Sequence, residues 1–343
     1  MMIMKKIINA PENYVNEMLL GIYAAHPDQL RMVGDEPRSL VAVKQTPGKV
    51  GIATGGGSGH LPLFLGYIGD GLLDGCSVGE VFQAPNADQM LSVTKEIDTG
   101  AGVLYIFGNY NGDKYNFKMS AEMADFEHNI RVESVVAADD IAVPAPTDES
   151  MPQTRRGVAG IVFVYKCAGA AAKEGMNLDE VKRVAQKAVD HVRTIGVALS
   201  PCIVPRVGTP TFSIEEGKMA LGMGIHGEPG IRVDDMKTAD ALVEDMMDAL
   251  LTDMPFAPGE DTAVLINSLG GTPLDELYIM MNRVSQILGE KKIGMYRAYV
   301  GEFATSMEMS GASISLLKLD DELKRLLDAP ADSPFFKQFY MGA

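Results

Sequence analysis

The sequence of 343 residues has no tryptophan, only three cysteines and five histidines, and fewer basic than acidic side chains. The 30 Lys and Arg residues against 46 Asp and Glu residues give a formal net charge of −16. Such a charge argues against a nucleic-acid-binding surface, because phosphate backbones are bound by clustered cations. It also repels anionic substrates at long range, so a neutral polyol or ketose is favoured. The isolated cysteines argue against a disulfide framework or a zinc site and are expected to be reduced core residues.

Long hydrophobic runs are also missing. The longest uncharged apolar run, around 157–165, is well short of the ~20 residues that a transmembrane helix needs. The segment 1–6 contains two lysines but is not followed by a hydrophobic segment of signal-peptide length. We therefore expect a cytoplasmic protein.

Strand-like and helix-like segments alternate along most of the chain, which predicts an α/β fold with mainly parallel sheets. Proline and glycine become frequent past Gly196, which predicts a boundary near residue 190 between two α/β lobes, 1–190 and 191–335. Asn177 and Glu180 are typical of a capping box at the start of a helix. The expected strands are 50–54, 103–107, 130–136, 263–267 and 314–318, and the expected helices lie near 116–126, 157–175, 177–195, 238–252 and 274–288.

The segment Gly55-Gly56-Gly57-Ser58-Gly59-His60 directly follows an expected strand. Glycines there let the backbone approach a small ligand closely. The segment does not match a Walker A loop, because it has no lysine. It does not match the Gly-x-Ser-x-Gly elbow of hydrolases either, because His60 stands where the last glycine would be. It fits a dinucleotide fingerprint only loosely, which leaves an oxidoreductase as a weak alternative. We expect a loop rich in backbone N–H groups, with Ser58 and His60 facing the ligand.

Two further segments carry candidate side chains. His226 lies in the glycine-rich segment 222–230, so two glycine-framed histidines suggest one site built from loops of both lobes. Asp113 follows the expected strand 103–107, and the carboxyl ends of strands are where open α/β sheets place functional groups. Structural alternatives are a helix cap or Asx-turn for Asp113 and a hydrogen-bonded structural role for His60.

Taken together, these motifs resemble the substrate-binding, DhaK-type subunit of dihydroxyacetone (glycerone) kinases. The motifs that carry the resemblance are 55–60, 109–117 and 224–230, with further agreement at 155–159, 267–278 and 305–307. The resemblance covers about residues 5–329, so both lobes together correspond to one DhaK domain.

The resemblance implies a phosphotransferase that acts on an alcohol group of a short-chain ketose. A histidine at the position of His226 attacks the ketone of the substrate and forms a covalent hemiaminal. Asp113 matches the base for the terminal hydroxyl, and His60 matches the residue that hydrogen-bonds the substrate and assists proton movement. Gly57 and Ser58 match the segment that contacts the ligand.

The resemblance also implies a division of labour between subunits. This chain is expected to bind no metal and no cofactor, because ATP or ADP with Mg²⁺ belongs to a separate DhaL-type nucleotide-binding subunit. Family members of this type are commonly homodimers. The alternative is a ligand-sensing co-activator that binds dihydroxyacetone without catalysis, but a sensor needs only the trapping histidine, so the presence of Asp113 and His60 favours the kinase.

Two positions depart from the family pattern. Leu61 stands where a glutamate is usual, and Gly108 stands where a lysine is usual. We expect Gly108 to remove a charged donor and to open volume beside the pocket, so that a four-carbon ketose such as erythrulose is admitted. The sequence leaves dihydroxyacetone and erythrulose open as substrates, and ATP and a phosphoenolpyruvate relay open as phosphoryl sources.

Overall fold

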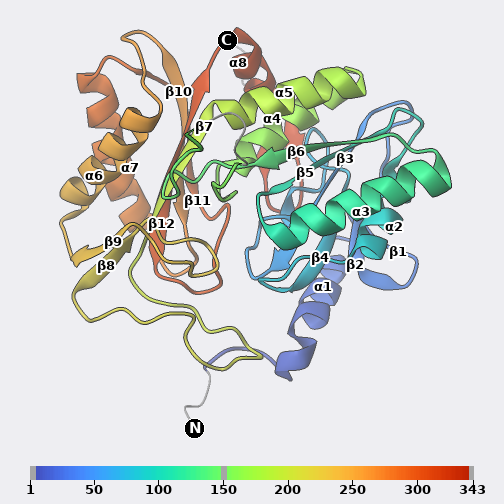
Figure 1. Ribbon diagram of the computed structural model, residues 1–343, viewed down its shortest axis with the longest axis horizontal. Helices are drawn as coiled ribbons and strands as arrows, with labels where there is room; N and C mark the ends of the chain where they lie inside the picture. Colours follow the sequence, from blue (N-terminus) through green and yellow to red (C-terminus); the bar gives the residue numbers. More distant parts are fainter. Residues whose placement is uncertain (1–4, 148–152, 340–343) are drawn as a thin grey trace.

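Two six-stranded sheets form the framework of the computed structural model, which describes residues 5–147 and 153–339 (Figure 1). The first sheet has the order β1-β2-β4-β3-β5-β6 and the second β11-β10-β12-β7-β8-β9. The first contains β1 (Leu30–Val33), β2 (Glu36–Ala42), β3 (Gly51–Ser58), β4 (Gly75–Val81), β5 (Val103–Gly108) and β6 (Val132–Ala137). The second contains β7 (Val192–Ala198), β8 (Lys218–Leu221), β9 (Arg232–Asp235), β10 (Asp261–Ser268), β11 (Gly294–Gly301) and β12 (Gly311–Leu319). A short hairpin, β13 (Ala331–Asp332) and β14 (Lys337–Gln338), follows near the end of the chain.

The helices lie on both faces of each sheet, so the α/β prediction is confirmed. They are α1 (Tyr14–Ala25), α2 (Ala87–Ile97), α3 (Asn111–His128), α4 (Ile161–Lys173), α5 (Leu178–Asp190), α6 (Ala239–Asp253), α7 (Leu274–Glu290) and α8 (Asp321–Asp328), with 3₁₀ turns at Pro11–Asn13 and Leu65–Tyr67. Helices α2 and α3 cover the outer face of the first sheet, and α6 and α7 cover that of the second. Helices α4, α5 and α8 lie between the sheets and share one large core with both of them.

The pairing of strands differs between the two sheets. In the first, β3 pairs in parallel with β4 and β5, and β5 with β6, as predicted. In the second, only β10 and β11 are parallel, so the prediction of mainly parallel pairing is wrong there. The reason lies in the connections, because parallel neighbours need a crossover and α7 supplies one only between β10 and β11. The segments from β7 to β8 and from β8 to β9 contain no helix, and these strands run antiparallel.

The strands and helices that the sequence predicts lie within a few residues of observed elements, whereas β1, β2, β4, β8, β9, β11, α1, α2 and α8 were not predicted. The capping box is confirmed, since Asn177 and Glu180 each accept a hydrogen bond from the other's backbone N–H. The helix ends at Asp190, however, and the predicted extension to 195 is wrong. Residues 192–198 form β7 instead, where β-branched side chains pair with β12. The apolar segment 157–175 is a buried helix as predicted, and every residue of α4 except Lys173 is buried.

The glycine segment is part of β3, so the expected loop at 55–57 is wrong. A Cβ on Gly56 would lie 2.0 Å from the Phe64 ring, and one on Gly55 would lie 2.7 Å from the Ser77 carbonyl oxygen. These glycines therefore let β3 pack tightly against its neighbours. The chain leaves the strand at Gly59, whose φ of +96° suits glycine, and His60 follows directly.

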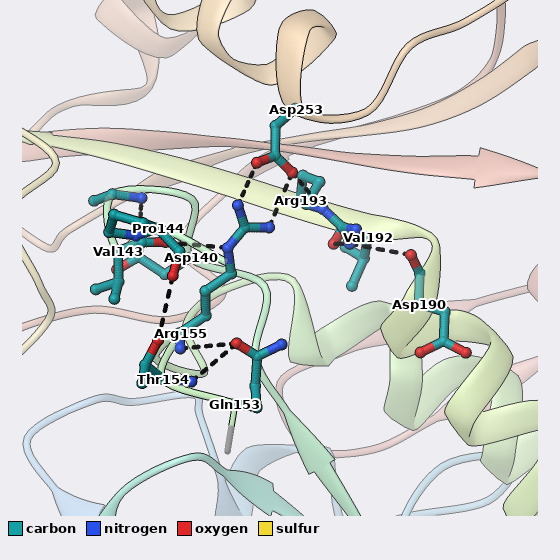
Figure 2. A network of polar contacts seen from close by, with 11 residues as sticks. Asp140, Val143, Pro144, Gln153, Thr154, Arg155, Asp190, Val192, Arg193 and Asp253 are labelled. Atoms are coloured by element: carbon teal, nitrogen blue, oxygen red, sulfur yellow. Dashed lines mark hydrogen bonds and ion pairs between the residues drawn. The ribbon is translucent and has the colours of Figure 1, made fainter. Parts of the chain in front are cut away.

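An ion-pair network joins the segment after β6 to the second sheet (Figure 2). The buried guanidinium of Arg155 pairs with Asp253 at the end of α6, and Arg193 of β7 donates to the same carboxylate from Nε at 2.7 Å. Burial raises the pKa of Asp253, but the two guanidinium groups outweigh it and hold that pKa below its usual range.

The predicted lobe boundary near residue 190 falls between the strands of the two sheets, and the division into lobes stays a prediction.

Two further expectations concern the cysteines and membrane-spanning helices. All three cysteines are buried free thiols, as predicted. Among the described residues, no helix combines the length and apolarity that crossing a bilayer requires.

Candidate active site

The carboxyl ends of β4, β3 and β5 are neighbours at one edge of the first sheet, and each leads into a candidate residue. Strand β3 leads to His60, β4 to Phe82, and β5 to Tyr110 and the first turn of α3. This is the edge at which open parallel sheets place ligands. The second sheet contributes the segment after β8, which carries His226, and the loop after β11, which contacts His60.

The ring of His60 is fully buried and is fixed in one tautomer. Its Nδ1 lies 2.8 Å from the carbonyl oxygen of Thr305, and because a carbonyl only accepts, Nδ1 carries the proton. Its Nε2 has no hydrogen-bond partner within the described part of the chain. Burial, together with the nearby charge of His226, lowers the pKa of His60 to about 3. His60 is therefore neutral at physiological pH and presents a free lone pair at Nε2.

The ring of His226, like that of His60, has its Nδ1 engaged in a hydrogen bond. Its Nδ1 lies 2.7 Å from Oε1 of Glu228, and its backbone N–H donates to Oε2 at 2.9 Å. Burial raises the pKa of Glu228, but the hydrogen bond and charge of His226 outweigh it and lower that pKa to about 2. An ionised carboxylate only accepts, so Nδ1 is the donor, and in the neutral imidazole the lone pair is therefore on Nε2.

Aromatic contacts bring the two imidazoles together. The ring centroids of His60 and His226 are 4.8 Å apart, with an interplanar angle of 77°. The Phe82 ring stacks on His60 at 4.8 Å, and Tyr110 meets His226 edge-on at 4.7 Å. Phe82 has a φ of +60°, a backbone strain that non-glycine residues tolerate mainly at functional sites.

Asp113 lies in the first turn of α3, with 7% of its surface exposed. Its Oδ1 is buried and has no hydrogen-bond partner among the described residues, and the helix N-cap is Tyr110. The alternative of a capping role therefore has no support in the contacts. Burial raises the pKa of Asp113 to about 7, although the nearby charge of His226 opposes the rise. A carboxyl group with such a pKa is suited to exchange protons near neutral pH.

The remaining two candidates lie at the end of β3. The Ser58 hydroxyl is buried and donates to the Gly79 carbonyl oxygen at 3.2 Å. A Cβ on Gly57 would lie 2.6 Å from the backbone nitrogen of Gln83. Both residues border the site through the backbone, and their contact with a ligand stays a prediction.

Sequence reasoning missed Glu228, Phe82, Tyr110 and Thr305. Glu228 follows His226 by two residues in a glycine-framed segment, a local signal that was available. The other three reach the histidines only through the folding of distant segments. Arg156 is a further case, since its buried guanidinium donates to the Gly222 carbonyl oxygen at 2.9 Å and so holds the segment that leads to His226.

The structure shows the surroundings of the two positions that depart from the family pattern. A Cβ on Gly108 would lie 3.0 Å from the Tyr110 ring. The Tyr110 hydroxyl donates to the Gly157 carbonyl oxygen at 3.1 Å, which fixes the ring beside His226. The expectation of extra volume at Gly108 stays a prediction. Leu61 packs against the main core, and its carbonyl oxygen accepts a hydrogen bond from Thr305.

In the described parts of the chain, no three His, Cys, Asp or Glu side chains are grouped so that they could hold a metal ion. The polar groups at this site are instead the two imidazoles, which are in contact, and the carboxyl group of Asp113, whose pKa the charge of His226 influences. Such a set suits a small neutral ligand with a carbonyl and hydroxyl groups, since it offers a nucleophile, a hydrogen-bond acceptor and an acid–base group.

Comparison with known proteins agrees with this geometry. The chain is 44% identical to the dihydroxyacetone-binding subunit DhaK of a PTS-dependent dihydroxyacetone kinase 2 from Listeria innocua, over 97% of this chain and 99% of that protein. It is 41% identical to an L-erythrulose kinase from Pectobacterium atrosepticum, over 99% of this chain and 57% of that one. The crystal structure of the native dihydroxyacetone kinase of C. freundii superimposes with a TM-score of 0.87 at 32% identity, over 97% of this chain and 60% of that chain. The Dak1 domain model matches residues 20–335, and the chain therefore belongs to the Dak1 domain family.

Proposed function

We propose that this protein is the substrate-binding subunit of a ketose kinase, in which His226 traps a short-chain ketose covalently for phosphoryl transfer. The observation that carries the proposal is the contact between His226 and His60, whose Nδ1 atoms are both engaged in hydrogen bonds and whose ring centroids are 4.8 Å apart. The match to a dihydroxyacetone-binding subunit along nearly its whole length supports the substrate class.

The trapping step uses the Nε2 lone pair of His226. It forms a bond to the carbonyl carbon, the π pair of the C=O bond moves to oxygen, and that oxygen takes up a proton. The imidazole becomes a cation, whose charge the ionised Glu228 balances through the Nδ1–H bond of 2.7 Å. The low pKa of Glu228 suits this role, because the carboxylate then stays ionised next to the new cation.

Asp113 and His60 complete the site. The new oxygen takes its proton from solvent, and Asp113, with a pKa of about 7, accepts the proton of the terminal hydroxyl as that hydroxyl attacks phosphorus. His60, which stays neutral, accepts a hydrogen bond from a substrate hydroxyl at Nε2 and thereby helps to order the proton movement. A covalently fixed ketose supplies the near-attack positioning on which phosphoryl transfer depends.

The phosphoryl donor belongs to a partner in this proposal. A DhaL-type subunit carries ATP or ADP with Mg²⁺, and this chain itself holds no metal or cofactor. Homodimer formation and a cytoplasmic location complete the proposal and rest on the family resemblance and the sequence. Erythrulose stays beside dihydroxyacetone as a candidate substrate, because relatives of similar identity include kinases named for each.

Charge on Glu228 is expected to assist trapping. Glu228→Gln keeps an acceptor near Nδ1 but removes the charge that balances the imidazolium, so the rate of adduct formation is expected to fall by about 10- to 100-fold. Intact mass spectrometry at timed intervals after addition of dihydroxyacetone measures this rate. Glu216→Gln removes a charge at an exposed position and serves as the control. Equal rates for Glu228→Gln and the control would remove Glu228 from the mechanism.

A substrate panel tests the proposed function. The protein is mixed with a DhaL-type subunit and its phosphoryl donor, and dihydroxyacetone, D-erythrulose, L-erythrulose and glycerol are offered in turn. We expect at least one ketose to be phosphorylated and glycerol, which has no carbonyl, to be left untouched. Adduct formation without any phosphorylation would favour the co-activator reading. Phosphorylation of dihydroxyacetone with neither erythrulose enantiomer used would end the erythrulose hypothesis.

A further inference from the structure

The loop after β11 contacts both histidine-bearing segments at once. Thr305 holds the first, since its carbonyl oxygen accepts from Nδ1 of His60 and its backbone N–H donates to the His60 carbonyl oxygen at 3.2 Å. Ser306 holds the second, since its hydroxyl donates to the Ile225 carbonyl oxygen at 2.5 Å, one residue before His226. Ser306 is fully buried. Two adjacent residues of one loop therefore hydrogen-bond to both histidine-bearing segments, whose imidazoles lie side by side in the proposed mechanism.

The loop is itself anchored by a buried amide at the end of β10. Oδ1 of Asn267 accepts from the backbone N–H groups of Phe303 and Ala304, each at 2.8 Å. Its Nδ2 donates to the Ala304 carbonyl oxygen at 2.8 Å and to the Ser313 hydroxyl at 3.2 Å. All the donors and lone pairs that an amide side chain offers are thus used. Asn267 is completely buried, so water does not compete for these bonds.

A second set of contacts, made by the backbone alone, joins the loop after β11 to the residues that follow β10. The N–H of Ser306 donates to the Leu269 carbonyl oxygen at 2.8 Å. A Cβ on Gly270 would lie 1.9 Å from the Met307 carbonyl oxygen, and Gly270 has a φ of +113°. Only glycine fits both the backbone conformation and the close approach. The motifs 267–278 and 305–307, to which the proposed function gives no role, thus form one structural unit.

We propose that this unit, and Ser306 in particular, positions His226 against His60 for ketose trapping. The inference rests on the proposed function. His60 follows a strand of the first sheet and His226 follows a strand of the second, so only non-covalent contacts set their mutual placement. A displacement of ~1 Å in such a pair can reduce a rate by about 10²-fold. Ser306 acts through the Ile225 peptide, and it is therefore a positioning residue.

The test compares two serine-to-alanine substitutions that each remove a fully buried hydroxyl. Ser306→Ala removes the bond to the Ile225 carbonyl oxygen. Ser333→Ala removes a hydroxyl that donates to the Gly66 carbonyl oxygen at 2.7 Å and also accepts from the Phe336 backbone N–H at 3.0 Å. We expect Ser306→Ala to slow adduct formation with dihydroxyacetone by at least about 10-fold. Ser333→Ala is expected to leave that rate within about twofold. Ser333→Ala removes more hydrogen bonds and is expected to lower Tm at least as much as Ser306→Ala, so a loss of stability alone does not explain slower trapping.

A second readout does not depend on ketose chemistry. Imidazole ¹⁵N and ¹³C chemical shifts of His226 and His60 in the ligand-free protein are expected to change in Ser306→Ala and to stay unchanged in Ser333→Ala. Unchanged shifts together with wild-type trapping in Ser306→Ala would overturn the inference, as would an equal loss of trapping in both variants. If the unsubstituted protein forms no adduct, the proposed function fails, and the chemical shifts still decide whether Ser306 places the rings. Should Ser306→Ala not fold, Ser306→Cys, which keeps the side-chain size with a weaker donor, takes its place.

Discussion

His226→Ala protein is expected to form no covalent adduct with any ketose and to lose phosphorylation activity by about 10³-fold or more. The expectation follows from the proposed mechanism, in which Nε2 of His226 is the nucleophile and His60, with its pKa of about 3 and its buried ring, does not replace it. Loss of the adduct also removes the near-attack placement of the substrate hydroxyl. Intact mass spectrometry after incubation with dihydroxyacetone and a coupled phosphorylation assay measure the two effects.

His128→Ala is the control for this substitution, since His128 lies at the end of α3 and its Nε2 is 3.9 Å from the carboxylate of the adjacent Glu127. We expect it to trap ketose at the unsubstituted rate. An adduct that persists in His226→Ala, or that maps to another residue by peptide analysis, would show that the nucleophile has been misassigned.

Asp113→Asn protein is expected to behave in the opposite way, retaining adduct formation while phosphorylation falls by about 10²- to 10⁴-fold. Asparagine keeps the size and one carbonyl oxygen of the side chain but does not accept the proton of the terminal hydroxyl. His226 and Glu228 are unchanged, so trapping still proceeds with a proton from solvent. The measurement is single-turnover phosphorylation of preformed adduct. Equal loss of trapping and of transfer would instead give Asp113 a binding role.

The pKa of Asp113 gives this substitution a pH signature. Activity of the unsubstituted protein is expected to rise with pH through about 7, as Asp113 ionises. The folded-state pKa is raised above its ordinary value, so folding is penalised increasingly as pH rises from about 4 to about 7, and the full penalty applies above that. Asp113→Asn is therefore expected to stabilise the protein at pH 8, by up to about 4 kcal/mol, and to have little effect near pH 4. Urea unfolding at both pH values checks the sign, and destabilisation at pH 8 would contradict it.

The parts of the fold that depend on short-range signals could be predicted from the sequence. The capping box at Asn177 and the buried helix α4 follow from neighbouring residues, and both are found as expected. The antiparallel order of the second sheet was not predictable in this way, because it depends on which distant strands meet. Strand β12, for example, pairs with both β7 and β10.

In the candidate site, too, the residues marked by neighbouring sequence were predictable, and those brought in by distant segments were not. His60, Asp113 and His226 stand out because glycines frame them, and the structure places the two histidine rings in contact. The side chains that set their chemistry come from elsewhere, as with Thr305, which lies 245 positions from His60 along the chain. At Gly108 the sequence shows that a side chain is missing, but it does not show that the Tyr110 ring lies 3.0 Å from where a Cβ would be.

A crystal structure of the protein soaked with dihydroxyacetone most directly tests whether two distant loops form one ketose trap. We expect continuous density from Nε2 of His226 to a tetrahedral carbon, with substrate oxygens within hydrogen-bond distance of His60 Nε2 and the Asp113 carboxyl group. A ketose bound with a planar carbonyl and no bond to His226, or bound away from His60, would contradict the account.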